Sequence, residues 1–283
     1  MSQSLAVLIV HGMGQQKETY ADELKEQLAD AYRLRSEDPE AASTHLCMEA
    51  VQWSHVFESG EEELFDRLVS RHDLRYQGLR RFIIHYLADA IAYQPVETAE
   101  HNYDAVHHTI SRSLQRLSER CGPAAPLCVI AHSLGAVIAS NYFYDLQYGV
   151  RPPAAEADTP MELGDTLALF YSIGTTLPLW SLRYRNFNRP ISVPSRRLHS
   201  LHPAVAGEWV NFYDKDDILG YPLRSIDPAY EEAVREDYEV RISDWLRGWN
   251  PLCHSEYLRS PEVIGRMADG LVRTWRAVNG GQE

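Results

Sequence analysis

Residues 127–136 combine the pattern of a buried strand with a serine in a sharp turn. The apolar run 127–131 ends at His132-Ser133-Leu134-Gly135, and a helix-compatible run follows. A serine at such a strand-to-helix turn is presented for reaction at the positive end of the helix. Because a serine hydroxyl needs a base and oxyanion donors to attack, the pattern favours acyl-transfer chemistry. An ordinary strand and helix with Ser133 as N-cap is the alternative.

The turn keeps small residues on both sides of the serine, with one departure from Gly-x-Ser-x-Gly. Gly135 occupies the second small position, and Ala131 stands where the first glycine would be. The segments that flank such a turn approach each other closely, so alanine is the replacement that disturbs it least.

Three further segments with reactive side chains follow predicted strands or precede the last predicted helix. They are His11-Gly12-Met13-Gly14, Asp214-Lys215-Asp216-Asp217 and Cys253-His254-Ser255-Glu256-Tyr257. Active groups in α/β sheets collect at the carboxyl ends of the strands. The order along the chain is therefore serine, acid, histidine.

With these segments, the chain resembles an α/β-hydrolase of the serine esterase or lipase kind, over residues 5–275. The resemblance implies that Ser133 is the nucleophile and His254 the base. It also implies an oxyanion hole made by the backbone N–H groups of Met13 and Leu134, an ester substrate and no cofactor.

The position of the acid follows from the spacing of the motif. An acid, one residue and then an apolar pair fits Asp216 followed by Asp217, Ile218 and Leu219, so we favour Asp216. Asp217 remains the alternative, since only one of two adjacent side chains can face the histidine. Asp214 lies too close to the strand.

Alternating strands and helices predict an α/β fold with a mainly parallel central sheet and helices on both faces. We expect one domain over residues 1–283, with strands at 5–10, 46–53, 127–131, 167–173 and 209–213 and a terminal helix at 261–278. Residues 54–120 form a mainly helical insertion that could serve as a cap or lid. Residues 175–207 could be a second excursion over the site.

The composition argues against several classes of binding partner. The net charge is −13, from 27 basic and 40 acidic side chains, which argues against general binding to nucleic acid or anionic lipid. The four cysteines form no CxxC pair, and no segment has a signal-peptide or membrane-spanning pattern, so we expect a cytoplasmic protein without integral membrane association. The 12 histidines form no HExxH motif, and we expect no metal.

The sequence leaves the substrate open. A small-molecule or lipid ester is the default, and thioesters and phospholipids fit the same chemistry. Aromatic residues such as Phe65, Tyr76 and Tyr93 could line an acyl pocket or belong to the core. A non-catalytic binding protein on the same fold and an acyltransferase that uses Ser133 are the competing interpretations. The oligomeric state is also open.

Overall fold

The core of the computed structural model is a parallel sheet. The structure describes residues 2–14, 16–72, 74–94, 102–154, 157–183, 185–242 and 251–280. In these ranges the strands are β1 (Leu5–Val10), β2 (Leu46–Val51), β3 (Leu127–His132), β4 (Leu167–Ile173), β5 (Glu208–Tyr213) and β6 (Glu236–Glu239). Their order is β2-β1-β3-β4-β5-β6, and every neighbouring pair is parallel. The predicted α/β fold with a parallel sheet is confirmed.

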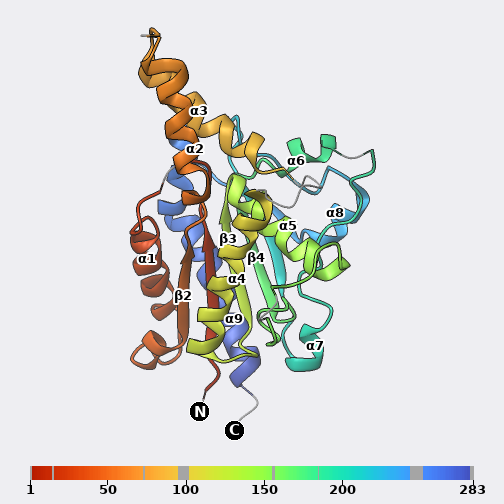
Figure 1. Ribbon diagram of the computed structural model, residues 1–283. Coiled ribbons are helices and arrows are strands. Elements are labelled where there is room, and N and C mark those ends of the chain that lie inside the picture. Colours follow the sequence, from red (N-terminus) through yellow and green to blue (C-terminus); the bar gives the residue numbers. More distant parts are fainter. Residues whose placement is uncertain are drawn as a thin grey trace.

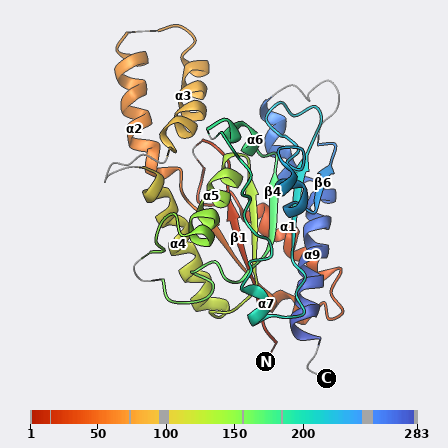
Figure 2. The same ribbon diagram turned by 90° about the vertical axis from the view of Figure 1, so that its right-hand side faces the viewer.

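Helices cover both faces of the sheet (Figures 1 and 2). The longer ones are α1 (Asp22–Arg33), α2 (His55–Phe65), α3 (Gln77–Ala92), α4 (Asn102–Cys121), α5 (Leu134–Tyr148) and α9 (Pro261–Asn279). The short ones are α6 (Leu177–Trp180), α7 (Leu198–Leu201) and α8 (Pro228–Ala233). The 3-10 helices are η1 (Ala41–Thr44), η3 (Ser181–Arg183) and the longer η4 (Pro251–Arg259), and η2 (Asp66–Ser70) is a π-helical turn. Helices α4 and α5 pack on one face, and α1 and α9 pack together on the other.

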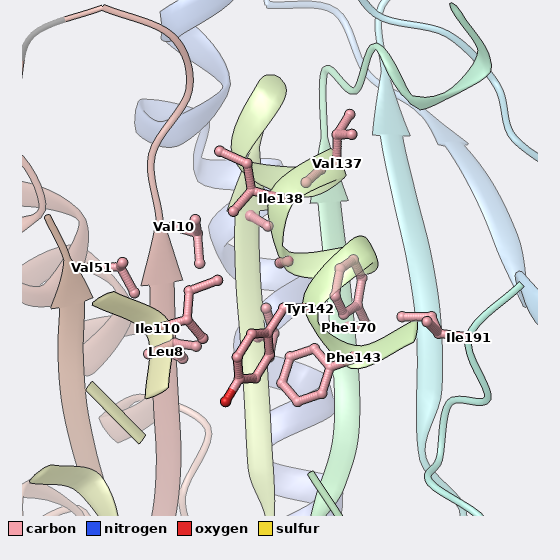
Figure 3. Packing of buried hydrophobic residues seen from close by; sticks show 14 of the residues in the cluster. Leu8, Val10, Val51, Ile110, Val137, Ile138, Tyr142, Phe143, Phe170 and Ile191 are labelled. Atoms are coloured by element: carbon pink, nitrogen blue, oxygen red, sulfur yellow. The ribbon is translucent and has the colours of Figure 1, made fainter. Parts of the chain in front are cut away.

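The apolar strands explain the two-faced core. Every residue of β1 is buried, and alternate residues belong to different clusters: Leu8 and Val10 face α4 and α5, whereas Val7 and Ile9 face α1 and α9. Figure 3 shows the first cluster, with the side chains of α5 packed over the central strands. A strand covered on both sides has no polar face, which is why its sequence is continuously apolar.

Helix α9 is tied to the sheet by a buried carboxylate. Glu208 of β5 accepts hydrogen bonds from Arg266 and Arg273 of α9, from Arg235 and from the hydroxyl of Tyr171. Burial alone would raise the pKa of Glu208, but these partners lower it below its ordinary value. The carboxylate is therefore charged, and it links the last helix to β4 and β5.

The five predicted strands and the terminal helix agree with the structure to within two residues, and one short strand was not predicted. All five predicted strands are present, and α9 begins with Ser260 as N-cap, whose hydroxyl oxygen accepts the N–H of Val263 at 3.5 Å. The additional strand, β6, reads Glu-Asp-Tyr-Glu and lies at the edge of the sheet, where it shows no apolar pattern.

Residues 54–120 are mainly helical, as predicted. Helices α2 and α3 form a hairpin (residues 55–92, here the α2–α3 hairpin) that projects beyond the sheet (Figure 2). Of its aromatic residues, Phe65 is buried and Tyr76 is exposed, and Tyr93 just after it lies in the core. In the described ranges, each helix is too short or too polar to cross a membrane.

Candidate active site

The predicted reactive segments meet at the carboxyl edge of the sheet. Strands β1 and β3 are neighbours, and the chain leaves them toward opposite faces and opposite edges of the sheet. Such a switch point is the usual place for an active site in a doubly wound sheet. The loop of Gly12 and Met13 follows β1, and Ser133 follows β3. The organisation expected of an α/β-hydrolase is therefore present at the level of the fold.

Ser133 has the strained backbone of a sharp turn. Its φ is 55° and its ψ is −125°, in a region that non-glycine residues avoid at a cost of about 1–3 kcal/mol. Its N–H donates to the carbonyl of Ile173 at 2.9 Å, and α5 begins at the next residue. The surrounding hydrogen bonds and packing thus hold a conformation that the residue alone would not adopt.

Close packing explains the small residues around Ser133. A Cβ on Gly135 would lie 2.2 Å from the carbonyl oxygen of His11, so the start of α5 rests directly on the end of β1. A Cβ on Gly12 would lie 2.8 Å from the Cβ of Ser133. Glycine is required at both positions, because Gly135 packs against the backbone of residues 10 and 11 and Gly12 packs against the side chains of His132 and Ser133. Ala131 fits in the sheet between Val10 and Ser172 and is fully buried.

His254 lies in η4 and is oriented by Asp217. The distance between His254 Nδ1 and Asp217 Oδ2 is 2.7 Å, and both residues are buried. Asp217 Oδ2 also accepts the hydroxyl of Tyr257 at 2.9 Å, and Oδ1 accepts the N–H of Leu219 at 3.0 Å. Burial alone would raise the pKa of Asp217, but the bonds from His254, Leu219 and Tyr257 lower it overall. Asp217 is therefore a carboxylate, and Nδ1 of His254 carries the hydrogen.

The favoured acid, Asp216, does not contact His254. Asp216 is exposed, and its backbone N–H donates to Asp214 Oδ1 at 2.9 Å. Asp214 is buried and also accepts the N–H of Ile242, so it organises the loop. The turn directs Asp217 inward and Asp216 to solvent, and the expected register must be corrected by one residue.

The remaining atoms of Ser133 and His254 are free to react. Ser133 Oγ and His254 Nε2 are buried, and neither has a hydrogen-bond partner among the described residues. No described residue accepts the backbone N–H of Met13 or Leu134 either. An unpaired base nitrogen, hydroxyl and two amide donors at one edge of the sheet are the groups that acyl transfer requires.

The two other histidines of the site have structural roles. His132 donates Nε2–H to the carbonyl of His254 at 2.7 Å, and burial lowers its pKa to about 3, so it is neutral. His11 stacks on Trp53 with ring centroids 4.7 Å apart, and burial lowers its pKa to about 4. His132 thus links the end of β3 to the segment that carries His254.

Gly174 and Tyr257 contact His254 or its carboxylate partner, and the sequence motifs predict no role for either residue. A Cβ on Gly174 would lie 2.9 Å from His254 Cε1, so this glycine provides the surface on which the imidazole rests. The hydroxyl of Tyr257 accepts the N–H of Asp214 at 2.8 Å and donates to Asp217, so it holds both ends of the turn at residues 214–217. The spacing His254-x-x-Tyr257 was the available signal.

The remaining candidate residues are the possible metal ligands and the cysteines. Within the described ranges, no group of three or more His, Cys, Asp or Glu side chains could hold a metal ion. The side chain of Cys253, and all of His101, lie outside the described residues. Cys47, Cys121 and Cys128 are free thiols.

Several solved structures share the overall course of this chain at low identity. No protein-family model matches the sequence, and no curated protein matches it. An esterase from Pyrobaculum calidifontis is 14% identical with a TM-score of 0.42, over 96% of this chain and 77% of that one. The esterase domain of a Rhodothermus marinus protein is 11% identical with a TM-score of 0.38, over 96% and 86%. A dienelactone hydrolase from Anabaena variabilis is 14% identical with a TM-score of 0.36, over 97% and 86%. At such values, function has to be inferred from the site itself.

Proposed function

We propose that this chain is a serine hydrolase that cleaves a carboxylic ester through an acyl-enzyme, with Ser133 as nucleophile, His254 as base and Asp217 as acid. The observation that carries the proposal is the state of His254. Its Nδ1–H is bound to Asp217, which leaves the Nε2 lone pair buried and unpaired. The His254 ring lies 4.7 Å from the ring of His132, the residue before Ser133. An imidazole that is oriented through Nδ1 by a carboxylate and has Nε2 unpaired is what a serine nucleophile needs.

In this mechanism, Ser133 Oγ attacks the carbonyl carbon of the ester while His254 Nε2 takes the hydroxyl proton. The carbonyl oxygen becomes an oxyanion, which the N–H groups of Met13 and Leu134 stabilise. As the tetrahedral intermediate collapses, His254 gives the proton to the leaving alcohol. Water then attacks the acyl-enzyme and loses a proton to Nε2 of His254. As this second intermediate collapses, His254 returns the proton to Ser133 Oγ and the acid product leaves.

Asp217 supports both proton transfers without taking up a proton. The carboxylate stabilises the imidazolium that forms at His254, and its lowered pKa keeps it charged.

The α2–α3 hairpin projects beyond the sheet from the segment that follows β2. We infer that it acts as a cap and that a small-molecule or lipid ester binds beneath it. The free thiols of Cys47, Cys121 and Cys128 favour a reducing compartment, so we propose a cytoplasmic location.

Labelling with a fluorophosphonate probe tests the nucleophile. We expect the wild-type protein and Ser140→Ala to be labelled and Ser133→Ala to be unlabelled, since Ser140 is a buried serine of α5 outside the proposed site. A panel of p-nitrophenyl esters of increasing acyl length then defines the substrate range. An unlabelled wild-type protein would favour a non-catalytic binding role, and acyl transfer to an added alcohol in preference to water would favour an acyltransferase.

A further inference from the structure

One buried carboxyl group of the α2–α3 hairpin holds the loop after β1. Asp89 lies in the last turn of α3, and its Oδ2 accepts the N–H of Gly14 at 2.7 Å. Only 1% of Asp89 is exposed, and its neighbour Glu61 of α2 is 5% exposed. A carboxyl group buried to this extent needs partners, and here one partner is a backbone amide of the catalytic loop.

The loop is fixed on both sides of Met13. On one side, Gly12 is packed against Ser133, because a Cβ there would lie 2.8 Å from the Cβ of Ser133. On the other side, Gly14 is held by Asp89 and has a φ of +88°, a conformation that favours glycine. The peptide unit that carries the Gly14 N–H is joined at the Met13 Cα to the unit that carries the Met13 N–H. Because both ends of this two-unit segment are held, release of Gly14 frees the rotations about φ and ψ of Met13 that set the direction of its N–H.

We propose that Asp89 is a positioning residue that sets the direction of the Met13 N–H and couples the position of the α2–α3 hairpin to stabilisation of the oxyanion. This inference rests on the proposed function, in which Met13 is an oxyanion donor. Movement of the hairpin away from the sheet would break the bond from Gly14 to Asp89 and release the loop. The site is therefore competent only when the hairpin is closed.

The chemistry of the carboxyl pair defines a conservative variant. Burial, together with the hydrogen bond and charge of Glu61, raises the pKa of Asp89 to about 8, although the bond from Gly14 opposes this shift. Asp89 is therefore mostly protonated near neutral pH, and its carboxyl group faces Glu61. Asparagine at position 89 reproduces this arrangement, since its oxygen can accept the Gly14 N–H while its amide hydrogens face Glu61. Alanine provides neither group.

Three variants separate positioning from folding: Asp89→Ala, Asp89→Asn and Asp66→Ala. Asp66 is an exposed acid of the same hairpin that pairs with Arg71, so its variant is the matched control. Loss of an oxyanion donor costs about 10²–10³ in kcat, and a displaced donor should cost less. For Asp89→Ala we expect kcat to fall by about 10- to 100-fold with KM within about twofold, whereas Asp89→Asn and Asp66→Ala stay within about threefold of wild type.

Amide hydrogen exchange of residues 11–16 tests the same bond without any activity. The loop of Asp89→Ala should exchange at least about tenfold faster than that of the wild type, because a buried acceptor has been removed, and Asp89→Asn should restore protection. Unchanged exchange in Asp89→Ala would overturn the proposal even if Ser133 proved not to be the nucleophile. Faster exchange with unchanged kcat in a protein that the probe labels at Ser133 would also overturn it. Equal damage in Asp89→Ala and Asp89→Asn would assign the effect to charge or packing rather than to the hydrogen bond.

Discussion

Replacement of Asp217 by asparagine should disable the base through its tautomer. Oδ1 of Asp217 accepts the backbone N–H of Leu219, so the amide oxygen of asparagine belongs at that position. The amide nitrogen then takes the place of Oδ2, which now lies 2.7 Å from His254 Nδ1. An amide N–H facing Nδ1 requires a lone pair there, and the imidazole hydrogen must move to Nε2. His254 can then no longer accept the proton of Ser133.

The size of the effect follows from this change of tautomer. The equivalent Asp→Asn change in the serine-protease triad lowers kcat by about 10⁴, and we expect a loss of about 10³–10⁴ here. This corresponds to about 4–5.5 kcal/mol of transition-state stabilisation. The stability cost should be smaller, about 1–2 kcal/mol, because the three hydrogen bonds of the Asp217 carboxylate lose their charge assistance while size is conserved.

The assay compares kcat/KM of wild type, Asp217→Asn and Asp216→Asn on one p-nitrophenyl ester, with thermal unfolding as the control for folding. The side chain of Asp216 is exposed, so its variant should stay within about twofold in activity and about 0.5 kcal/mol in stability. A larger loss in Asp216→Asn would refute the assignment. A loss below about tenfold in Asp217→Asn would show that another group orients His254.

Three further perturbations test the packing and charge of the same framework. Gly174→Ala should lower kcat by more than about tenfold, because the new Cβ would lie 2.9 Å from His254 Cε1. Gly149→Ala is the control: its φ is also positive (+62° against +52°), but no atom lies within 4 Å of the new Cβ, so it should only lower the free energy of unfolding by about 1–2 kcal/mol. Glu208→Gln should lower the free energy of unfolding, measured with urea, by about 2–3 kcal/mol, while activity per folded molecule stays unchanged. The loss is limited to this size because two of the three arginine partners are at least half exposed and their pairing is screened by solvent. The free energy of unfolding should fall as the pH rises from about 5 to 8, because the raised pKa of Asp89 makes the folded state bind more protons than the unfolded state over that range. A flat profile in the wild type, or an equally steep one in Asp89→Asn, would contradict this prediction.

Much of the sheet could be predicted because its strands are buried on both faces. Residues 5–10 and 167–173 are continuous apolar runs, and both strands have the predicted bounds. Strand β6 could not be found in this way, since an edge strand of Glu-Asp-Tyr-Glu has polar neighbours and no apolar period. Its place is set by pairing with β5, which is a tertiary effect.

Local motifs are enough to predict Ser133 and His254 as candidates, but contacts between distant segments determine the other residues around them. The bond between Asp89 and Gly14 joins residues 75 positions apart, and no local pattern marks either of them as a partner. Gly174 is likewise required by the ring of a residue 80 positions away in the sequence. Such requirements become visible only when the fold has brought the segments together.

The choice between the adjacent aspartates shows how a local motif and a distant contact combine. In η4, a helix with about three residues per turn, His254 and Tyr257 lie on the same side, three positions apart. The Tyr257 hydroxyl accepts the N–H of Asp214 and donates to Asp217, while His254 donates to the same carboxylate oxygen. A carboxylate at position 217 meets both donors, whereas one at position 216 meets neither. The short helix therefore carries both the proposed base and the hydroxyl that favours Asp217 over Asp216, so Tyr257→Phe should weaken the alignment of Asp217 without removing it.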